Sequence, residues 1–433
     1  MTPFSIGIFG CLALVFLLAC SMPVGLSMAI VGVIGFALIT SWKASLAILS
    51  ADVFDVFANY NLTVIPLFVL MGQIAFHAGI SKRLFAAAHA WTSSLRGGLA
   101  MATVGACAAF GAICGSGPAT AATMAAVALP EMKRYKYDMA LAGGTVAAGG
   151  SLGMLIPPSV VFIVYGILTE QSIGKLFIAG ILPGILMAIL FCAMIAFKCW
   201  RHPELAPCAM PTSWGERIRS LTGVLETVIL FVFVMGGMFL GWFTPTEGAA
   251  VGAVGSIVIA CLGGNCSLKQ VWQASQETLR TSCMVLIIVA GATVFGHFLA
   301  VTGLPMQFAA WLTSLPLPSW AILLVIIAFF ILAGCFIDAL ALVLLTIPIF
   351  YPVILKMGYN PIWFGVIIVV VTQMGVITPP VGVNAYVVSG IDRSIPLQTV
   401  FRGAMPFLVA MILTCVLLIL FPSIATWLPT IVR

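Results

Sequence analysis

Charge is what this sequence has least of. Of its 433 residues only 7% are Asp, Glu, Lys or Arg, and four are histidines. Such a composition excludes a soluble domain of ordinary type. It also argues against nucleic-acid binding, because the few basic clusters flank apolar runs and no separate domain carries them. The twelve cysteines show no CxxC spacing, which favours small packing side chains over disulfides or a metal centre.

Long apolar runs take up most of the chain. Hydrophobic residues make up 62% of it, and residues 181–197 and 404–421 are examples of continuous runs. Runs close to the roughly 20 residues that span a bilayer as a helix indicate an all-α polytopic membrane protein. A membrane β-barrel would instead show alternating apolar and polar residues. Residues 3–19 lack a basic leader and a small-residue cleavage site, so we expect a retained span rather than a signal peptide.

Two pairs of adjacent prolines interrupt apolar runs at matching positions. The pairs at 157–158 and 379–380 stand 222 residues apart, and they follow polar interruptions at Ser116 and Asp338 respectively. Proline removes a backbone N–H and clashes with the preceding turn, so neither segment can remain one unbroken helix. In lipid such breaks are tolerated only where protein or a water-filled cavity covers them. The sequence therefore predicts an internal duplication, and matched breaks of this kind point to the binding site of a transporter.

The remaining sequence follows the same plan twice. Each half is predicted to contain two spans, an amphipathic arm along the membrane surface, a third span, a re-entrant hairpin, a broken helix and a closing helix. Hairpin arms of about 15 residues are too short to cross a hydrocarbon core of about 30 Å. The first half is predicted to consist of a scaffold at 1–96, with an arm at 42–61, and a transport half at 97–200, with a hairpin at 98–132 and a broken helix at 139–168. A loop at 201–218 joins the halves. The second half is predicted to consist of a scaffold at 219–317, with an arm at 267–282 and a separate span at 283–301, and a transport half at 318–433, with a hairpin at 320–355 and a broken helix at 362–390.

Basic residues indicate which loops face the cytoplasm. If the segment around Lys133 is cytoplasmic, counting the predicted spans places the 201–218 loop inside and Lys356 outside. The second hairpin then enters the membrane from the face opposite to the first, so the two repeats are inverted. The basic residues assigned to the cytoplasmic side are Lys82, Arg83, Arg96, Lys133, Arg134, Lys136, Lys198, Arg201, Arg217 and Arg219, and the span count adds Lys269, Arg280, Arg393 and Arg402.

The half-helix ends at the hairpin tips and helix breaks form the candidate site. Helix N-termini offer positive partial charge and free N–H groups to a carboxylate, while C-terminal ends offer carbonyls to a small cation. An organic anion and Na⁺ are therefore the expected ligands. We predict Na⁺ contacts from Gly115, Ser116, Gly149, Gly150 and Ser151 in the first half and from Gly334, Asp338, Thr372, Gln373 and Thr378 in the second, with substrate contacts from Ser116, Gly117, Pro157, Ser159, Asp338 and Asn384.

Several polar residues in the apolar runs have two interpretations. A carboxylate such as Asp338 is expensive inside the membrane, which favours a functional role over a structural hydrogen bond. Asn384 fits a substrate contact or a helix–helix hydrogen bond equally well. We interpret Arg393 as a charge at the cytoplasmic surface, His297 as a packing residue rather than a proton relay, and Glu247 as a cap for the span that follows it.

Other functions remain as alternatives. Residues 149–153 read G-G-S-L-G and formally match the nucleophile elbow of serine hydrolases. That motif requires a preceding strand and a histidine partner, whereas here an apolar helix is expected before it and the four histidines are unsuitably placed. An intramembrane hydrolase is therefore the weaker hypothesis, and a protein that is not an enzyme is the stronger one. A passive channel fits poorly with two closed hairpins and a duplicated, discontinuous site.

Four motifs in order resemble one known family. They are GSGPATAAT at 115–123 with LPEM at 129–132, GGSLGMLIPPS at 149–159, TPTEGAA at 244–250 and TPPVG at 378–382. Together they are similar to the large membrane subunit of tripartite ATP-independent periplasmic (TRAP) transporters, from about residue 60 to the C-terminus.

This resemblance implies an elevator-type importer in a bacterial or archaeal inner membrane. It implies uptake of a carboxylate, such as a C4-dicarboxylate or a sugar acid, driven by Na⁺. Its partners would be a periplasmic binding protein and a small four-helix membrane subunit, which we expect to be a separate chain. One Na⁺ site would lie between 115–116 and 149–153, and the other between 334–338 and 372–378. A binding-protein-independent Na⁺/anion symporter or exporter of the same fold is the alternative.

Overall fold

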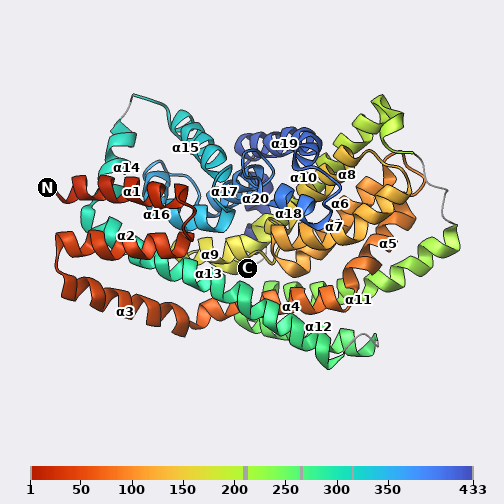
Figure 1. Cartoon of the computed structure of the whole chain (residues 1–433), viewed down its shortest axis with the longest axis horizontal. Coiled ribbons are helices and arrows are strands. Elements are labelled where there is room, and N and C mark those ends of the chain that lie inside the picture. Colours follow the sequence, from red (N-terminus) through yellow and green to blue (C-terminus); the bar gives the residue numbers. More distant parts are fainter. Residues whose placement is uncertain (1, 208–212, 264–266, 315, 432–433) are drawn as a thin grey trace.

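The computed structural model describes residues 2–207, 213–263, 267–314 and 316–431 as α-helices joined by short connections and three 3-10 turns (Figure 1). The first half of the chain contains α1 (Pro3–Ala19), α2 (Val24–Ile39), α3 (Trp42–Ala58), η1 (Tyr60–Thr63), α4 (Val64–His77), α5 (Ile80–Thr92), α6 (Gly98–Cys114), α7 (Gly117–Arg134), α8 (Met139–Ser151), η2 (Leu152–Met154), α9 (Val160–Leu168) and α10 (Ile173–Arg201).

The second half of the chain repeats this order. It contains η3 (Pro203–Leu205), α11 (Trp214–Phe239), α12 (Pro245–Leu262), α13 (Leu268–Thr302), α14 (Leu304–Ser314), α15 (Ser319–Gly334), α16 (Ala339–Lys356), α17 (Pro361–Gly375), α18 (Val383–Ile391), α19 (Leu397–Leu420) and α20 (Ser423–Ile431). The helices α7 and α16 both have 18 residues, and both begin directly after the predicted polar interruption. The two hairpins, the two broken helices and their order therefore confirm the duplication.

Helices pack in two groups that lie along each other. One group contains α2, α3, α4, α11, α12 and α13, which run along the lower part of Figure 1. The other contains the hairpins α6–α7 and α15–α16, the broken helices α8–α9 and α17–α18, and the closing helices α10 and α19. The short helices α5 and α14 join the groups, since α5 packs on α6 and α14 packs on α16. Each hairpin is thus attached to the first group through a matching connector.

The second arm differs from the prediction of an arm followed by a separate span. α13 is one continuous helix of 35 residues that covers both. In the first half α3 ends at Ala58, and Asn59 adopts an extended conformation in which its side-chain oxygen accepts from Asn61 N at 2.8 Å. The sequence around Ser282 contains no such competing side-chain turn, so the helical hydrogen bonds of α13 continue.

The predicted 201–218 loop is shorter than expected at its C-terminal end. α11 begins at Trp214 because Ser213 and Glu216 form a reciprocal capping box, with N–H to side-chain oxygen distances of 3.1 and 3.3 Å. Residues 208–212 of that loop lie outside the described residues. The same type of cap starts α12, where Glu247 accepts from Thr244 N at 2.8 Å, as the sequence predicted for Glu247.

Several of the described helices are long enough to cross a bilayer. Seven segments are long and apolar enough to cross a bilayer: 60–77, Ile173–Arg201, Trp214–Phe239, Pro245–Leu262, Leu268–Thr302, Ala339–Lys356 and Leu397–Leu420. The hairpin helices α6, α7, α15 and α16 have 17, 18, 16 and 18 residues. The prediction that the hairpin arms are too short to cross the bilayer is therefore wrong for α16, which is one of the seven segments. The fold is that of a polytopic helical membrane protein.

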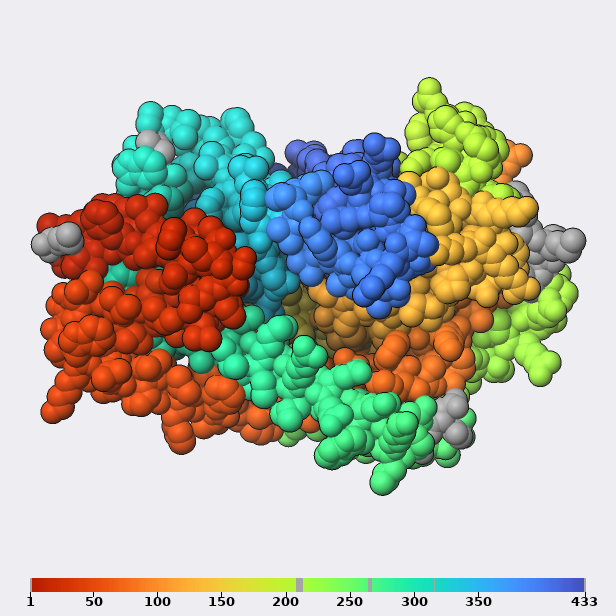
Figure 2. Space-filling model, viewed as in Figure 1, coloured from red at the N-terminus to blue at the C-terminus, as the bar shows by residue number. Residues whose placement is uncertain are grey.

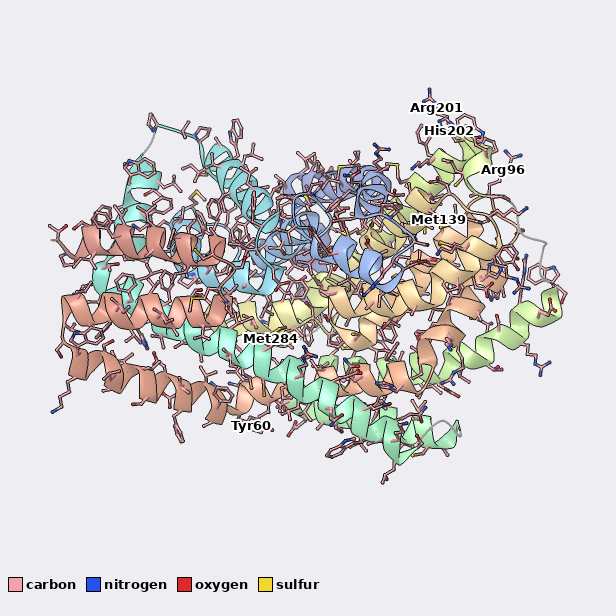
Figure 3. The ribbon with its side chains drawn as sticks, in the orientation of Figure 1. Tyr60, Arg96, Met139, Arg201, His202 and Met284 are labelled. Carbon is pink, nitrogen blue, oxygen red and sulfur yellow. The ribbon has the colours of Figure 1, made fainter. Side chains whose placement is uncertain are left out.

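Basic residues from separate connections gather at one end of the molecule. Figure 3 shows Arg96, Arg201 and His202 close to one another, far from Tyr60. Arg96 lies between α5 and α6, and Arg201 is the last residue of α10. Both were assigned to the cytoplasmic side from the sequence, and their gathering at one end agrees with that assignment.

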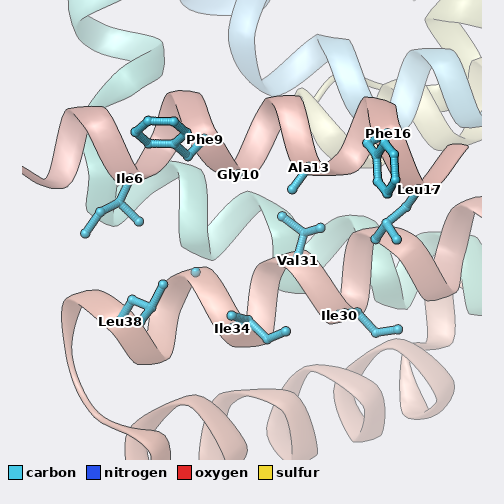
Figure 4. A pocket seen from close by; sticks show the side chains of 11 residues that line it. Ile6, Phe9, Gly10, Ala13, Phe16, Leu17, Ile30, Val31, Ile34 and Leu38 are labelled. Atoms are coloured by element: carbon cyan, nitrogen blue, oxygen red, sulfur yellow. The ribbon is translucent and has the colours of Figure 1, made fainter. Parts of the chain in front are cut away.

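A groove of about 460 Å³ lies between α1 and α2, at the N-terminal edge (Figure 4). Phe9 and Phe16 of α1 and Ile30, Ile34 and Leu38 of α2 are among its apolar lining residues. No charged or hydrogen-bonding side chain lines it, so it offers nothing that would recognise an organic anion. The polar groups that could bind an anion or a cation lie at the hairpin tips instead.

Candidate functional site

The tip of the first hairpin contacts the break of the first broken helix. Gly115 ends α6 in the left-handed region with φ 66°, and Ser116 is the N-cap residue of α7 without a side-chain capping bond. A Cβ added at Gly153 would lie 2.6 Å from Thr120 Oγ1 and 3.0 Å from the Ser116 carbonyl oxygen. Tip and break therefore approach closely, and only glycine fits at 153.

The end of α8 forms the other wall of this half-site. A Cβ at Gly117 would lie 3.5 Å from the carbonyl oxygen of Gly150, so these two predicted residues are neighbours. Gly149 instead faces α6, where a Cβ would lie 2.9 Å from Cys107 Sγ. Ser151 is buried, and its hydroxyl donates to the Ala148 carbonyl at 2.6 Å. Gly117 of the tip and Gly150 of α8 are therefore the two predicted residues that meet here.

The residues after the first break already have structural hydrogen bonds. The Gly115 carbonyl accepts from Val160 N at 3.3 Å. Ser159 is fully buried and caps α9: its hydroxyl donates to the Met154 carbonyl at 2.5 Å and accepts from Phe162 N at 3.4 Å. Pro157 is buried beside it. The contacts of Ser159 show a local capping role, while its predicted substrate contact stays a prediction.

The second hairpin tip also contacts its helix break, and here backbone atoms meet backbone atoms. Gly334 ends α15 and Gly375 ends α17. A Cβ at Gly375 would lie 2.3 Å from the Gly334 carbonyl carbon, which cannot move away as a flexible side chain would. Asp338 is the N-cap residue of α16, and its Oδ2 accepts from Leu340 N at 3.1 Å. Asp338 and Ser116 thus occupy equivalent capping positions, as the repeat offset predicted.

Gln373 is a buried residue of the second half-site whose side-chain amide has no hydrogen-bond partner. It is fully buried near the end of α17, and neither its amide oxygen nor its amide nitrogen has a hydrogen-bond partner. The neighbouring hydroxyls are occupied, since Thr372 donates to Val369 O at 3.0 Å and Thr378 donates to Met374 O at 2.6 Å. A buried amide without partners is costly, so it indicates a position for water, an ion or a ligand.

Asn384 joins the two repeats. Its Nδ2 donates to the Ala147 carbonyl of α8 at 3.0 Å, while its Oδ1 is buried without a partner. The helix–helix hydrogen bond that the sequence suggested is therefore present. The oxygen remains free to accept from a bound group, so the substrate contact stays open as a second role.

The donor set at the tips consists of carbonyls, hydroxyls, amides and one carboxylate. Within the described part of the chain, no group of three or more His, Cys, Asp or Glu side chains could hold a metal ion. Oxygen donors with little formal charge suit a hard cation. The N-termini of α7 and α16 also point their partial positive charge at the tips, where an anion would be favoured.

The surroundings of Ser151, His297 and Arg393 bear on the other predicted roles. Ser151 follows the helix α8 rather than a strand, so the local structure is not a nucleophile elbow. His297 Nδ1 lies 2.8 Å from Asp52 Oδ2, so this histidine has a partner, but its side chain is 51% exposed and its packing role stays a prediction. Arg393 is exposed beyond the end of α18, as expected for a surface charge.

Sequence reasoning placed Gly153 and Gly375 inside the ranges 149–153 and 372–378 but did not name either glycine, or Thr120, as a site residue. The signal was present, because the two glycines are equivalent under the 222-residue offset and each directly faces a hairpin tip. The prediction concentrated on possible ligands, whereas these positions are defined by the absence of a side chain.

Comparison with known families matches residues 11–424 to the family described as "Tripartite ATP-independent periplasmic transporter, DctM component". The chain is 36% identical to the C4-dicarboxylate TRAP transporter large permease protein DctM of Pseudomonas aeruginosa, over 88% of this chain and 89% of that one. It is 33% identical to the sialic acid TRAP transporter large permease protein SiaM of Vibrio cholerae, over 98% and 97%.

A longer relative and a solved structure complete the comparison. The chain is 34% identical to the isethionate TRAP transporter permease protein DctMQ of Oleidesulfovibrio alaskensis, over 96% of this chain but only 65% of that one. Among solved structures, the YdaH transporter of Alcanivorax borkumensis superimposes with a TM-score of 0.59 and 17% identity, over 89% and 90% of the two chains. At that identity the likeness shows the fold alone.

Proposed function

Because this chain belongs to the DctM component family of tripartite ATP-independent periplasmic transporters, we propose that it imports an organic acid together with Na⁺. Membership makes it a TRAP large permease, a multi-pass protein of the bacterial inner membrane and a transporter rather than an enzyme. The substrate class proposed here is a carboxylate such as a C4-dicarboxylate or a sugar acid.

The observation that carries the proposal is the paired contact between hairpin tip and helix break. At Gly153 the first break meets the Ser116 carbonyl of the first tip, and at Gly375 the second break meets the Gly334 carbonyl of the second tip. The N-termini of α7 and α16 begin within a few residues of these carbonyls. The carbonyls suit Na⁺, and the N-termini suit a carboxylate. The unpartnered amide of Gln373 and the unpartnered oxygen of Asn384 supply further groups at the second break.

We assign one Na⁺ to each half-site. In the first half the proposed ligands come from Gly115, Ser116, Gly149, Gly150 and Ser151. In the second half they come from Gly334, Asp338, Thr372, Gln373 and Thr378. The substrate would bind between the half-sites, and the hairpins with the broken helices would move as an elevator against the other helices.

Two partner chains belong to the proposal. A periplasmic binding protein would deliver the substrate, and a small four-helix subunit would pack in the membrane beside this chain. The family description and the fused relative named DctMQ support a multi-component system. Entry of net positive charge would gain about 2.3 kcal/mol per charge from each 100 mV of membrane potential.

The test is uptake into proteoliposomes that contain both membrane subunits. A panel of labelled C4-dicarboxylates and sugar acids is supplied with the cognate binding protein, under an inward Na⁺ gradient or an equal K⁺ gradient. We expect uptake only with Na⁺ and only with the binding protein. Uptake that is equal in K⁺ would overturn Na⁺ coupling. Uptake of free substrate alone would identify the chain as a self-sufficient symporter of the same fold.

A further inference from the structure

Each broken helix crosses to the hairpin of the other repeat. After the second break α18 packs against α7 of the first hairpin, and after the first break α9 packs against α16 of the second hairpin. Figure 2 shows the blue segment that contains α18 lying against the gold segment that contains α7. The outer halves of the broken helices therefore exchange partners between repeats.

α18 is fastened to the first repeat near both of its ends. At its start Asn384 Nδ2 donates to the Ala147 carbonyl at 3.0 Å. Just beyond its end the Asp392 carboxylate forms an ion pair with Lys133 near the end of α7, and Lys133 Nζ donates to Ser394 Oγ at 2.5 Å. Thr378 lies in the break before α18 and Gln373 lies near the end of α17, so a displacement of α18 is passed to the second break through a connection of seven residues, 376–382.

The acceptor side of this ion pair is rigid. Asp392 Oδ1 accepts from Ser394 N at 3.1 Å and from the Ser394 hydroxyl at 2.8 Å. The side chain of Asp392 is 20% exposed and that of Lys133 is 38% exposed. The hydrogen bond from Lys133 keeps the pKa of the Asp392 carboxyl below its usual range, so this carboxylate stays ionised at neutral pH.

α9 is fastened to the second repeat by neutral groups. The Tyr165 hydroxyl donates to the Pro361 carbonyl at the start of α17, at 2.7 Å. Just beyond the end of α9, Gln171 Nε2 donates to the Tyr351 hydroxyl of α16 at 3.2 Å, and that hydroxyl donates to the Thr169 carbonyl at 3.3 Å. The contact at the base of the second hairpin thus mirrors the ion pair at the base of the first.

We propose that the Lys133–Asp392–Ser394 and Tyr351–Gln171–Thr169 contacts are two clamps that hold each hairpin against the crossed half-helix and thereby fix the geometry of the ion site. These are positioning residues, remote from the tips. The inference rests on the proposed function, because it predicts an effect on the transported ion. The hairpin tip and the helix break are in close contact. If the base of a hairpin moves away from α18 or α9, the hairpin helix tilts, and the proposed ion ligands at its tip are displaced.

The primary test measures the Na⁺ concentration for half-maximal uptake in proteoliposomes containing both membrane subunits and supplied with binding protein. For Lys133→Ala or Asp392→Asn we expect an increase of up to about five-fold, the scale of one exposed ion pair, with a smaller change in maximal rate. Tyr351→Phe, which removes only the hydroxyl, should act in the same direction. Arg134→Ala is the matched control, because the Arg134 side chain is 75% exposed on the same helix.

A charge exchange and a cross-link separate positioning from general damage. Lys133→Asp combined with Asp392→Lys should restore the Na⁺ dependence that either single change weakens, and absence of restoration would overturn the ionic clamp. Lys133→Cys with Asp392→Cys, joined by a short bifunctional thiol reagent, should still transport. Loss of uptake on joining would show that the clamp must open, which contradicts a positioning role.

The two proposals fail in different ways. Unmodified protein that shows no Na⁺-dependent uptake would overturn the proposed function. Unmodified protein with Na⁺-dependent uptake, whose half-saturating Na⁺ concentration is the same in Lys133→Ala, Tyr351→Phe and Arg134→Ala, would overturn the clamps alone.

Discussion

Gly375 shows how tightly the second half-site is assembled. Its Cα hydrogen points at the Gly334 backbone, with 2.3 Å between an added Cβ and the Gly334 carbonyl carbon. We expect Gly375→Ala to reduce Na⁺-dependent uptake by at least about five-fold, because overpacking of about 1–3 kcal/mol would separate tip from break. Gly296→Ala is the control, since an added Cβ there meets nothing within 4 Å. Equal uptake by the two variants would contradict a close tip-to-break contact.

Gln373 permits a sharper separation of function from stability. An unpartnered buried amide costs about 1–3 kcal/mol, so Gln373→Leu should leave thermal stability unchanged or raise it. If the amide serves a bound ion, the same variant should raise the half-saturating Na⁺ concentration several-fold. Differential scanning fluorimetry with and without Na⁺, together with uptake, measures both. A large loss of stability in Na⁺-free buffer would show that Gln373 has a purely structural role.

Asp338 combines a capping bond with a formal charge. Asparagine can keep the cap to Leu340 N, whereas alanine removes it at a cost of about 1 kcal/mol. We expect Asp338→Asn to fold normally yet lose most uptake, and Asp338→Ala to lose uptake and some stability. Full uptake by Asp338→Asn would leave the carboxylate with a capping role only. The comparison needs only uptake and a melting temperature for each variant.

At the scale of elements, the two arms differ in whether the helix is interrupted between the arm and the span that follows it. α13 continues through Ser282, while α3 and α4 are separated by η1. Ser282→Pro should therefore destabilise the protein by about 3 kcal/mol, because proline breaks an interior helical bond. Tyr60→Pro should cost much less, since Tyr60 is the first residue of η1 and the preceding Asn59 is already extended. Chemical denaturation in detergent would measure the difference.

The helix breaks and hairpin tips, which depend on local proline and glycine residues, were predicted well from the sequence. Proline pairs and glycine-rich tips located both breaks, and the repeat offset matched α7 to α16 residue for residue. The continuity of α13 was missed because polar composition was taken as a helix boundary. Pairings across the fold were also missed. His297 and Asp52 lie 245 residues apart, and no periodic pattern along the chain specifies which distant side chains meet.

The same limit applies to the candidate site. Glycine hinges, N-caps and the isolated carboxylate follow from elementary rules for helices, so Ser116, Gly334 and Asp338 were identifiable. The hydrogen bond from Asn384 to Ala147 depends on how α18 packs on α8, which only the folded chain determines. Which polar groups remain unpartnered, as in Gln373, likewise emerges only after all neighbours are placed.

At the scale of the whole molecule, the inverted arrangement makes a prediction about sidedness. Arg201→Cys, at the end where basic residues gather, should be protected from an impermeant maleimide in intact cells. Lys356→Cys, at the end of α16, should be labelled. The background should carry serine at the exposed Cys20 and Cys261. Labelling of both introduced cysteines from the same side would contradict inverted repeats.

The 35-residue helix α13 also has a mechanical consequence for the protein in its bilayer. A straight helix of that length, about 52 Å at 1.5 Å per residue, answers a change in bilayer thickness by tilting as a whole. The α3–α4 pair can instead change its angle at η1. In the first half, a change in bilayer thickness is thus taken up by a change of the α3–α4 angle at η1. In the second half, the same change tilts α13 along its whole length, so lipid chain length affects the two hairpins unequally.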